Sequence, residues 1–138
     1  MPNFVRVFAM TVPTARLAFF KLNVPDLEQA TTFWREAFGF EVLAKFDEAE
    51  FREHVMAIPS DGPAPNLMLV QYKDGRVVTV GPGHGPVGLL CDDIRASHAQ
   101  AVASGAVKDG EIFEAAGVKI AVLKSPQGHE IELIQMAG

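Results

Sequence analysis

Cysteine is almost absent from this 138-residue sequence, which has Cys91 alone. One cysteine excludes an intramolecular disulfide, and this is typical of a reducing compartment, so a cytoplasmic protein is expected. Cys91 ends an apolar run that begins at Val87, and Asp92 and Asp93 follow it. Because a reactive thiol needs nearby cations, these neighbours favour a small buried side chain over a nucleophile.

Basic residues and long apolar runs are also scarce. The chain has 12 lysines and arginines against 17 acidic residues, a formal net charge of −5, and no basic cluster. A nucleic-acid partner is therefore not expected. Arg6, Pro13 and Arg16 interrupt the apolar N-terminal stretch before it reaches the length of a membrane span, and no signal-cleavage pattern follows. A membrane partner is not expected either.

The sequence lacks the short motifs that identify many enzymes. It contains no nucleophile elbow, phosphate-binding loop, HExxH or CxxC pair. Hydrophobic residues make up 49% and charged residues 21%, which is ordinary for a globular protein. The length suits one domain that buries a core without disulfides or metal. Function must therefore be inferred from the order of strands and helices.

The first half of the chain predicts a strand, a helix and three further strands. The helix is expected to begin after Asp26, a good N-cap, and to end at Gly39, which tolerates a left-handed backbone. Between them, Leu27, Phe33 and Trp34 belong to one apolar stripe at helical spacing. The strands are predicted at residues 17–24, 40–46, 51–58 and 67–72.

The second half repeats this order after the glycine- and proline-rich segment 81–86. Its helix is expected to begin after Asp93 and to end before Gly105, with Ile94, His98, Ala101 and Val102 on one side. Its strands are predicted at residues 87–91, 107–113, 118–123 and 130–136, with a turn at 125–128 before the last strand.

Two short matches indicate an internal repeat. The segment 24–27 matches the segment 91–94, which lies 67 residues later, and 67–71 matches 131–135, which lies 64 residues later. The predicted fold class is therefore α+β, with two βαβββ modules at residues 17–72 and 86–136 in one domain. Residues 1–16 form an N-terminal extension, which is expected to add an edge strand or to pack on a partner subunit.

These motifs resemble the vicinal oxygen chelate superfamily, which includes glyoxalases, bleomycin-resistance proteins and extradiol dioxygenases. The first module carries the helix opening 24–27, Phe33-Trp34 and the segment 39–42, and the second carries 92–94, 103–106 and the ending 125–133. The resemblance covers about residues 17–136. It implies that each module curls its sheet into half a barrel and that a ligand cavity lies between the modules.

Metal-dependent members of that superfamily place one ligand on the first and last strand of each module. The corresponding positions here are Phe19, Met68, Pro86 and Glu132. Of these, only Glu132 offers an oxygen to a hard divalent ion. The resemblance therefore implies no metal cofactor at this position. A rearranged metal site that uses Glu132 and His84, two residues before Pro86, is the alternative.

Strand alternation predicts which side chains share the cavity with these positions. If Phe19 faces inward, Ala18, Phe20, Leu22 and Val24 face the helix. The expected lining is mostly apolar, as in small-molecule sites, and consists of Phe19, Lys21, Asn23, Met68, Val70, Tyr72, Glu132, Ile134 and Met136. Glu132 is the best catalytic candidate.

Two questions stay open at this point: how the charge of Glu132 is satisfied, and whether any of the four histidines has a role. An unpaired buried carboxylate is costly, so either Lys21 pairs with Glu132 or Glu132 is solvated or protonated while Lys21 reaches solvent. His84 is expected in a surface linker, with the ligand role above as its alternative. No role is expected for the other histidines, His54, His98 and His129.

Three functions are compatible with this pattern. The first is metal-independent binding of a small, partly apolar molecule between the modules. The second is a glyoxalase-type lyase or dioxygenase with the rearranged metal site. The third is a structural or subunit role in which Phe19, Met68 and Met136 close a vestigial cavity. A homodimer is expected, with residues 1–16 helping to cover its apolar surface.

Overall fold

The computed structural model describes residues 12–62 and 65–137. Its elements follow the predicted order, with one short 3₁₀ helix, η1, in the first module. The bounds are β1 (Phe19–Asn23), α2 (Leu27–Phe38), β2 (Glu41–Asp47), β3 (Phe51–Ala57), η1 (Pro59–Asp61), β4 (Asn66–Tyr72), β5 (Val87–Leu90), α3 (Ile94–Ala103), β6 (Val107–Ala115), β7 (Val118–Lys124) and β8 (Glu130–Met136).

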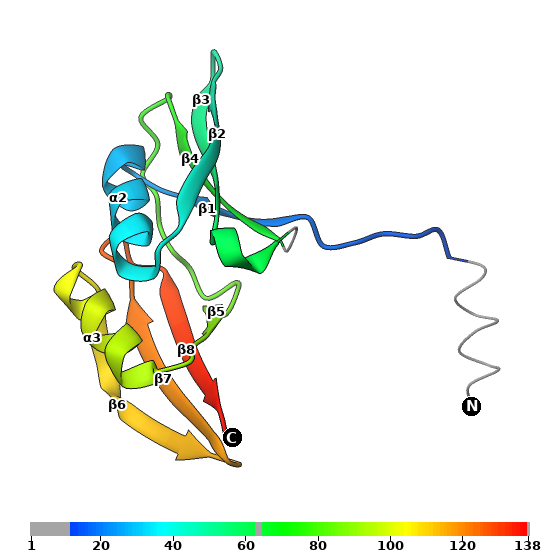
Figure 1. Cartoon of the computed structure of the whole chain (residues 1–138). Coiled ribbons are helices and arrows are strands. Elements are labelled where there is room, and N and C mark those ends of the chain that lie inside the picture. The colour runs from blue at the N-terminus through cyan, green and yellow to red at the C-terminus, as the bar shows by residue number, and fades with distance from the viewer. Residues whose placement is uncertain (1–11, 63–64, 138) are drawn as a thin grey trace.

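The strands form two four-stranded mixed sheets, ordered β1-β4-β3-β2 and β5-β8-β7-β6 (Figure 1). In each sheet the first strand runs parallel to the last strand of its module, and the other neighbours are antiparallel. The parallel pair requires a crossover connection, which here contains the helix and the two middle strands of the module. The predicted α+β fold of two βαβββ modules is confirmed.

The N-terminus of each helix is held by the same two hydrogen bonds. Asp26 caps α2 by accepting from the Gln29 N–H at 3.0 Å, and Gln71 Oε1 on β4 accepts from the Leu27 N–H at 2.8 Å. In the second module, Asp93 accepts from Ala96 and Gln135 Oε1 accepts from Ile94. These bonds satisfy helix N–H groups that have no partner within the helix. The sequence repeat therefore includes the residues that tie each helix to its last strand.

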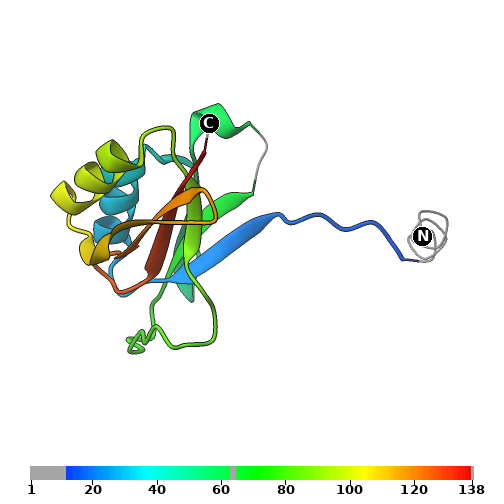
Figure 2. The same ribbon diagram turned by 90° about the horizontal axis from the view of Figure 1, so that it is seen from below.

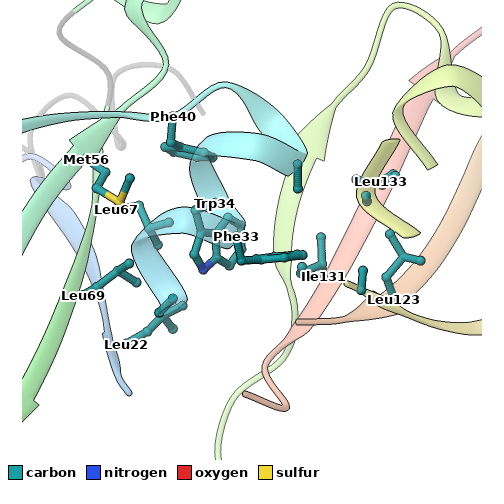
Figure 3. Packing of buried hydrophobic residues seen from close by; sticks show 14 of the residues in the cluster. Leu22, Phe33, Trp34, Phe40, Met56, Leu67, Leu69, Leu123, Ile131 and Leu133 are labelled. Carbon is teal, nitrogen blue, oxygen red and sulfur yellow. The ribbon is translucent and has the colours of Figure 1, made fainter. Parts of the chain in front are cut away.

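One hydrophobic core spans both modules. Leu27 and Trp34 of α2 are completely buried, and the cluster extends to Leu123, Ile131 and Leu133 of the second module. In Figure 3, the Phe33 ring points from α2 toward Ile131. The two helices also contact each other. Helix contact therefore joins the modules, while their sheets remain separate.

The second helix is only partly buried. Ile94 and Ala101 of α3 are buried and His98 is half-buried, but Val102 is 41% exposed. The side of α3 that carries these four residues is therefore only partly covered by the core. Cys91, just before α3, is buried as expected, and burial raises the pKa of its thiol above 9.0.

Both helices lie on one side of the sheets, so one face of each sheet carries no helix (Figure 2). These two surfaces are called the helix-free faces. Residues 12–18 are exposed and extend away from the domain, outside any strand. The expected roles of residues 1–11 lie outside the described residues. Among the described helices, none is long and apolar enough to cross a bilayer.

The hydrogen bonds that Gln71 and Gln135 accept from the helix N-termini give the first testable prediction. Gln71→Leu and Gln135→Leu each leave a helix N–H without its acceptor, which costs about 1–3 kcal/mol in the free energy of unfolding. The two losses are expected to add, because the bonds lie in separate modules. Urea denaturation measures both. Gln29→Leu, which removes only an exposed side-chain bond to Gln127, serves as the control. Unchanged midpoints in both variants would contradict the proposed role.

Candidate functional site

The first strand has the predicted register. Leu22 and Val24 are buried in the core, whereas Phe19, Lys21 and Asn23 are exposed on the helix-free face. Phe20 lies on the other face, as alternation requires, but it remains 56% exposed. Its ring lines a pocket at the junction of the modules instead of packing under the helix.

Parallel pairing with β4 brings the predicted residues of the first module together. Lys21 lies beside Met68 and Asn23 lies beside Val70. Tyr72 follows on the same face, and its ring lies 6.0 Å from that of Phe51 on β3, measured between centroids. Met68 and Tyr72 are half-buried and Val70 is buried. The first sheet therefore presents an apolar surface with polar groups at its edge.

The charge partner of Lys21 comes from β3. Lys21 Nζ lies 2.7 Å from Glu53 Oε2, and the Glu53 side chain is 7% exposed. The ammonium also lies 5.3 Å from the centre of the Phe19 ring, at a distance suited to a cation–π contact. Lys21 thus pairs with Glu53, and the ion pair with Glu132 considered from the sequence does not occur among the described residues.

Glu53 was missed because strand register, which the sequence left undetermined, brings it to the site. Antiparallel pairing sets Glu53 opposite Val70 and Val55 opposite Met68. A signal was present, since alternation separates Glu53 from His54 and sends the two side chains to opposite faces. His54 lies in the core, and its Nδ1 is 2.8 Å from the Thr31 hydroxyl oxygen. Burial lowers the pKa of His54 below 6.5.

The predicted residues of the second module lie together on β8. Glu132, Ile134 and Met136 share the helix-free face, where Glu132 lies beside Gly88 of β5 and Val122 of β7. Neither neighbour has a polar side chain. Met136 is 57% exposed and Phe19 is 45% exposed. These residues therefore do not close a cavity within one chain.

The four positions that the superfamily resemblance assigns to metal ligands occupy equivalent places in the two modules. In the first module, Phe19 lies two residues before Lys21, which pairs with Met68. In the second module, Pro86 lies two residues before Gly88, which pairs with Glu132. The two pairs are therefore equivalent, but a phenyl ring, a thioether and a proline ring cannot replace hard ligands. Within residues 12–62 and 65–137, no three His, Cys, Asp or Glu side chains are grouped to hold an ion. These residues do not fit the metal.

The modules meet at pockets that contain few residues of the predicted lining. One pocket of about 240 Å³ lies between Phe20, Phe40 and Leu67 of the first module and residues 87–89 of the second. Another, of about 310 Å³, is lined by Lys21, Asn23 and the linker before β5. None of the pockets described contains both Met68 and Ile134. The helix-free faces are open surfaces in a single chain.

Comparison with known families matches residues 16–133 to the model of the "Glyoxalase/Bleomycin resistance protein/Dioxygenase superfamily". The chain belongs to this superfamily. The match covers both βαβββ modules, from the residues before β1 into β8. The resemblance inferred from the sequence is confirmed, and with it the fold of the superfamily.

The similar proteins include both a probable enzyme and a binding protein, according to their names. A probable lactoylglutathione lyase of Vibrio parahaemolyticus is 28% identical over 129 residues, which cover 87% of this chain and 90% of that protein. A glyoxalase family protein of Bacillus cereus has a TM-score of 0.80 at 16% identity, over 93% and 98% of the chains. An antibiotic binding protein, TnmS3, from a Streptomyces species has a TM-score of 0.71 at 27% identity, over 91% and 99%.

The Lys21–Glu53 pair gives a second prediction. Lys21→Met is expected to destabilise the protein at pH 7, because Glu53 is left buried without its partner. A double-mutant cycle with Glu53→Gln should give a coupling energy of about 1–2 kcal/mol. This is less than the roughly 3–5 kcal/mol lost on breaking a fully buried pair, since the Lys21 side chain is 39% exposed. Additive losses in urea denaturation would show that the pair contributes nothing.

Burial of His54 gives a third prediction, on pH. Its folded pKa lies below the unfolded value of 6.5, so the unfolded chain binds the proton first as pH falls. The stabilising effect is complete above the unfolded pKa and is lost below it. The free energy of unfolding should therefore fall less steeply between pH 7 and pH 5 in His54→Gln than in the wild type. The difference in slope is at most about 1.4 kcal/mol per pH unit. Denaturation at each pH measures this, and parallel curves would contradict it.

Proposed function

We propose that this protein binds a small, partly aromatic molecule on its helix-free faces, without the metal that related enzymes use. The observation that carries the proposal is the set of residues at the four metal positions. Three of the four, Phe19, Met68 and Pro86, have apolar side chains or a thioether. The same substitutions that remove the ligands of a hard ion supply contact area for an apolar ligand.

The surroundings of Phe19 support an aromatic ligand with a polar group. Phe19, Met68 and the Phe51–Tyr72 ring pair offer flat and adaptable apolar contacts. Lys21 and Glu53 lie beside them as one ion pair, which can orient a polar substituent without leaving an unpaired charge. On the second sheet, Glu132 among Ile134 and Met136 provides a single acidic group.

Similarity alone supports binding and catalysis about equally. TnmS3, named an antibiotic binding protein, matches nearly the whole chain at 27% identity. The probable lactoylglutathione lyase matches at 28% and favours the enzyme alternative. In that alternative, Glu132 and His84 of this chain would be the metal ligands. The metal positions discriminate between the two functions, because Lewis-acid chemistry on this fold needs more than one hard ligand. We therefore favour binding.

Exposed apolar side chains favour a homodimer as the active form. Large apolar residues stay open to solvent on the helix-free faces, and pairing registers assign Phe46, Leu90, Phe113 and Met136 to these faces. An exposed apolar surface of this kind is typical of an association site. A second chain would convert two open faces into an enclosed cavity.

The fourth prediction tests ligand binding. In a thermal-shift screen of aromatic and 1,2-dicarbonyl compounds, at least one aromatic compound is expected to stabilise the protein. Phe19→Ala should weaken its binding about 3–10-fold through loss of ring contact. Glu132→Gln should change the preference between charged ligands.

Phe20→Ala is the matched control, because it removes the neighbouring ring from the opposite face of the same strand. It should leave affinity unchanged. If no compound stabilises the wild-type protein, or if Phe20→Ala weakens binding while Phe19→Ala does not, the proposed site is wrong.

The fifth prediction concerns assembly. The wild-type protein should sediment as a dimer at micromolar concentration, and Leu90→Arg should shift it toward the monomer by burying a charge in the interface. Val77→Lys is the control, because Val77 lies in the linker and is 88% exposed. A wild-type monomer under these conditions would contradict the dimer.

A further inference from the structure

The linker after β4 brings an arginine back to the helix-free face of the first sheet. The central guanidinium carbon of Arg76 lies 3.8 Å from the centre of the Tyr72 ring at the end of β4. That ring belongs to the helix-free face and lies 6.0 Å from the ring of Phe51. A planar guanidinium this close stacks on the ring and gains a cation–π contact. Arg76 was absent from the lining predicted by strand alternation, because it lies in the linker.

Asp74 holds the guanidinium of Arg76 from a second direction. Its two carboxylate oxygens accept from Nε, both at 3.0 Å, and Oδ2 also accepts from Nη2 at 2.6 Å. The backbone N–H of Arg76 donates to Oδ1 as well, at 3.1 Å. The ring of Tyr72 fixes the plane of the guanidinium and Asp74 fixes its direction within that plane. The group is therefore oriented before any ligand arrives, which lowers the entropy cost of binding.

One edge of the oriented guanidinium has no acceptor. Asp74 occupies the edge formed by Nε and Nη2, and within residues 12–62 and 65–137 no hydrogen bond engages Nη1. The edge formed by Nη1 and the second hydrogen of Nη2 therefore keeps two parallel donors. Two parallel N–H groups are the geometry in which arginine binds both oxygens of a carboxylate. The Arg76 side chain is 49% exposed, so a ligand can reach this edge.

A pocket of about 450 Å³ lies beside Arg76, and its charges are nearly balanced. It is lined by the end of β4, the residues that follow and the turn between β2 and β3. Lys73 Nζ lies 2.6 Å from Asp47 Oδ1, which neutralises its charge. Glu50 lines the pocket without an ion pair among the described residues, so it repels an anion. His84, farther along the linker, is exposed and lines a different pocket. These charges favour one singly charged group at Arg76 over a phosphate.

We propose that the ligand of the helix-free faces is an aromatic carboxylic acid and that Arg76 binds its carboxylate. The inference rests on the proposed function for the aromatic part of the ligand, which packs on Phe46 and Phe51 beside the arginine. Pairing registers assign both of these rings to the helix-free face, and Phe46 is 44% exposed. Arg76 then determines specificity for the carboxylate, and Asp74 is a positioning residue that acts through Arg76.

Binding of naphthoate and of its neutral amide, naphthamide, to the full chain tests the proposal by titration calorimetry. The two probes share one ring system, so the ratio of their dissociation constants isolates the carboxylate contact. Naphthoate is expected to bind about tenfold more tightly, because both of its oxygens accept charge-assisted hydrogen bonds. Arg76→Gln should abolish this preference while naphthamide still binds. Arg76→Lys keeps the charge but neither the paired donors nor the stack, and should lose most of the preference.

Two further variants and one spectroscopic signal locate the contact. Glu50→Gln should strengthen naphthoate binding about two- to threefold, because it removes a repelling charge from the pocket. Arg52→Gln is the matched control, since Arg52 pairs with Glu28 of α2 on the helix side, and it should not change the ratio. Tyr72 is the single tyrosine of the chain, so its ring signals in proton NMR are unique, and naphthoate should shift them in the wild type.

A ratio that is unchanged in Arg76→Gln, or a full preference that persists in Arg76→Lys, overturns the inference. If naphthamide binds and only the ratio fails to respond, the proposed function stands without the carboxylate. If neither compound binds, the carboxylate site is wrong, and the wider screen of aromatic compounds decides the proposed function separately.

Discussion

Burial of the first helix against both modules is the constraint on which the rest of the structure depends. Leu27 and Trp34 are fully buried, and the core they belong to continues into Ile131 of the second module. Burial of large side chains of this kind contributes about 1.5–3 kcal/mol each. Because the shared core lies on the helix side, it leaves the other face of each sheet without a helix, and these faces become the surfaces available for ligand or partner.

The helix-free face of the first sheet combines an apolar surface with an ion pair. Glu53 is buried, and a buried carboxylate without a partner would be costly. Lys21 on the edge strand β1 satisfies it, and the Lys21 ammonium also lies over the Phe19 ring. This arrangement is the basis for proposing that the face recognises a ligand without metal.

The two modules share the residues that fold them and differ in the residues on their helix-free faces. The residues that fold each module recur, namely the aspartate N-cap and the glutamine that accepts from the helix N-terminus. The residues on the helix-free faces do not recur, since Lys21 of β1 corresponds to Gly88 of β5. Alternation along a strand permits this separation, because folding residues and site residues occupy opposite faces. Each face can change without disturbing the other.

The sequence by itself determined the elements, their order and the faces of the strands. Asp26, Gly39 and Asp93 predicted helix limits correctly because capping is a local interaction between residues close in the chain. The predicted face of Phe19 and Lys21 was correct because burial of Leu22 and Val24 allows only one register. The repeat at 67 and 64 residues predicted two modules because each one must build the same core.

The tertiary structure decided which of those residues meet. Glu53 reaches Lys21 through strand pairing between residues 32 positions apart, and Arg76 reaches the Tyr72 ring from the linker. Periodicity states the direction of a side chain but not its neighbour on the next strand, because pairing register depends on turns, bulges and the packing of the whole sheet. The partner of Lys21 and the position of Arg76 therefore followed only from the folded chain.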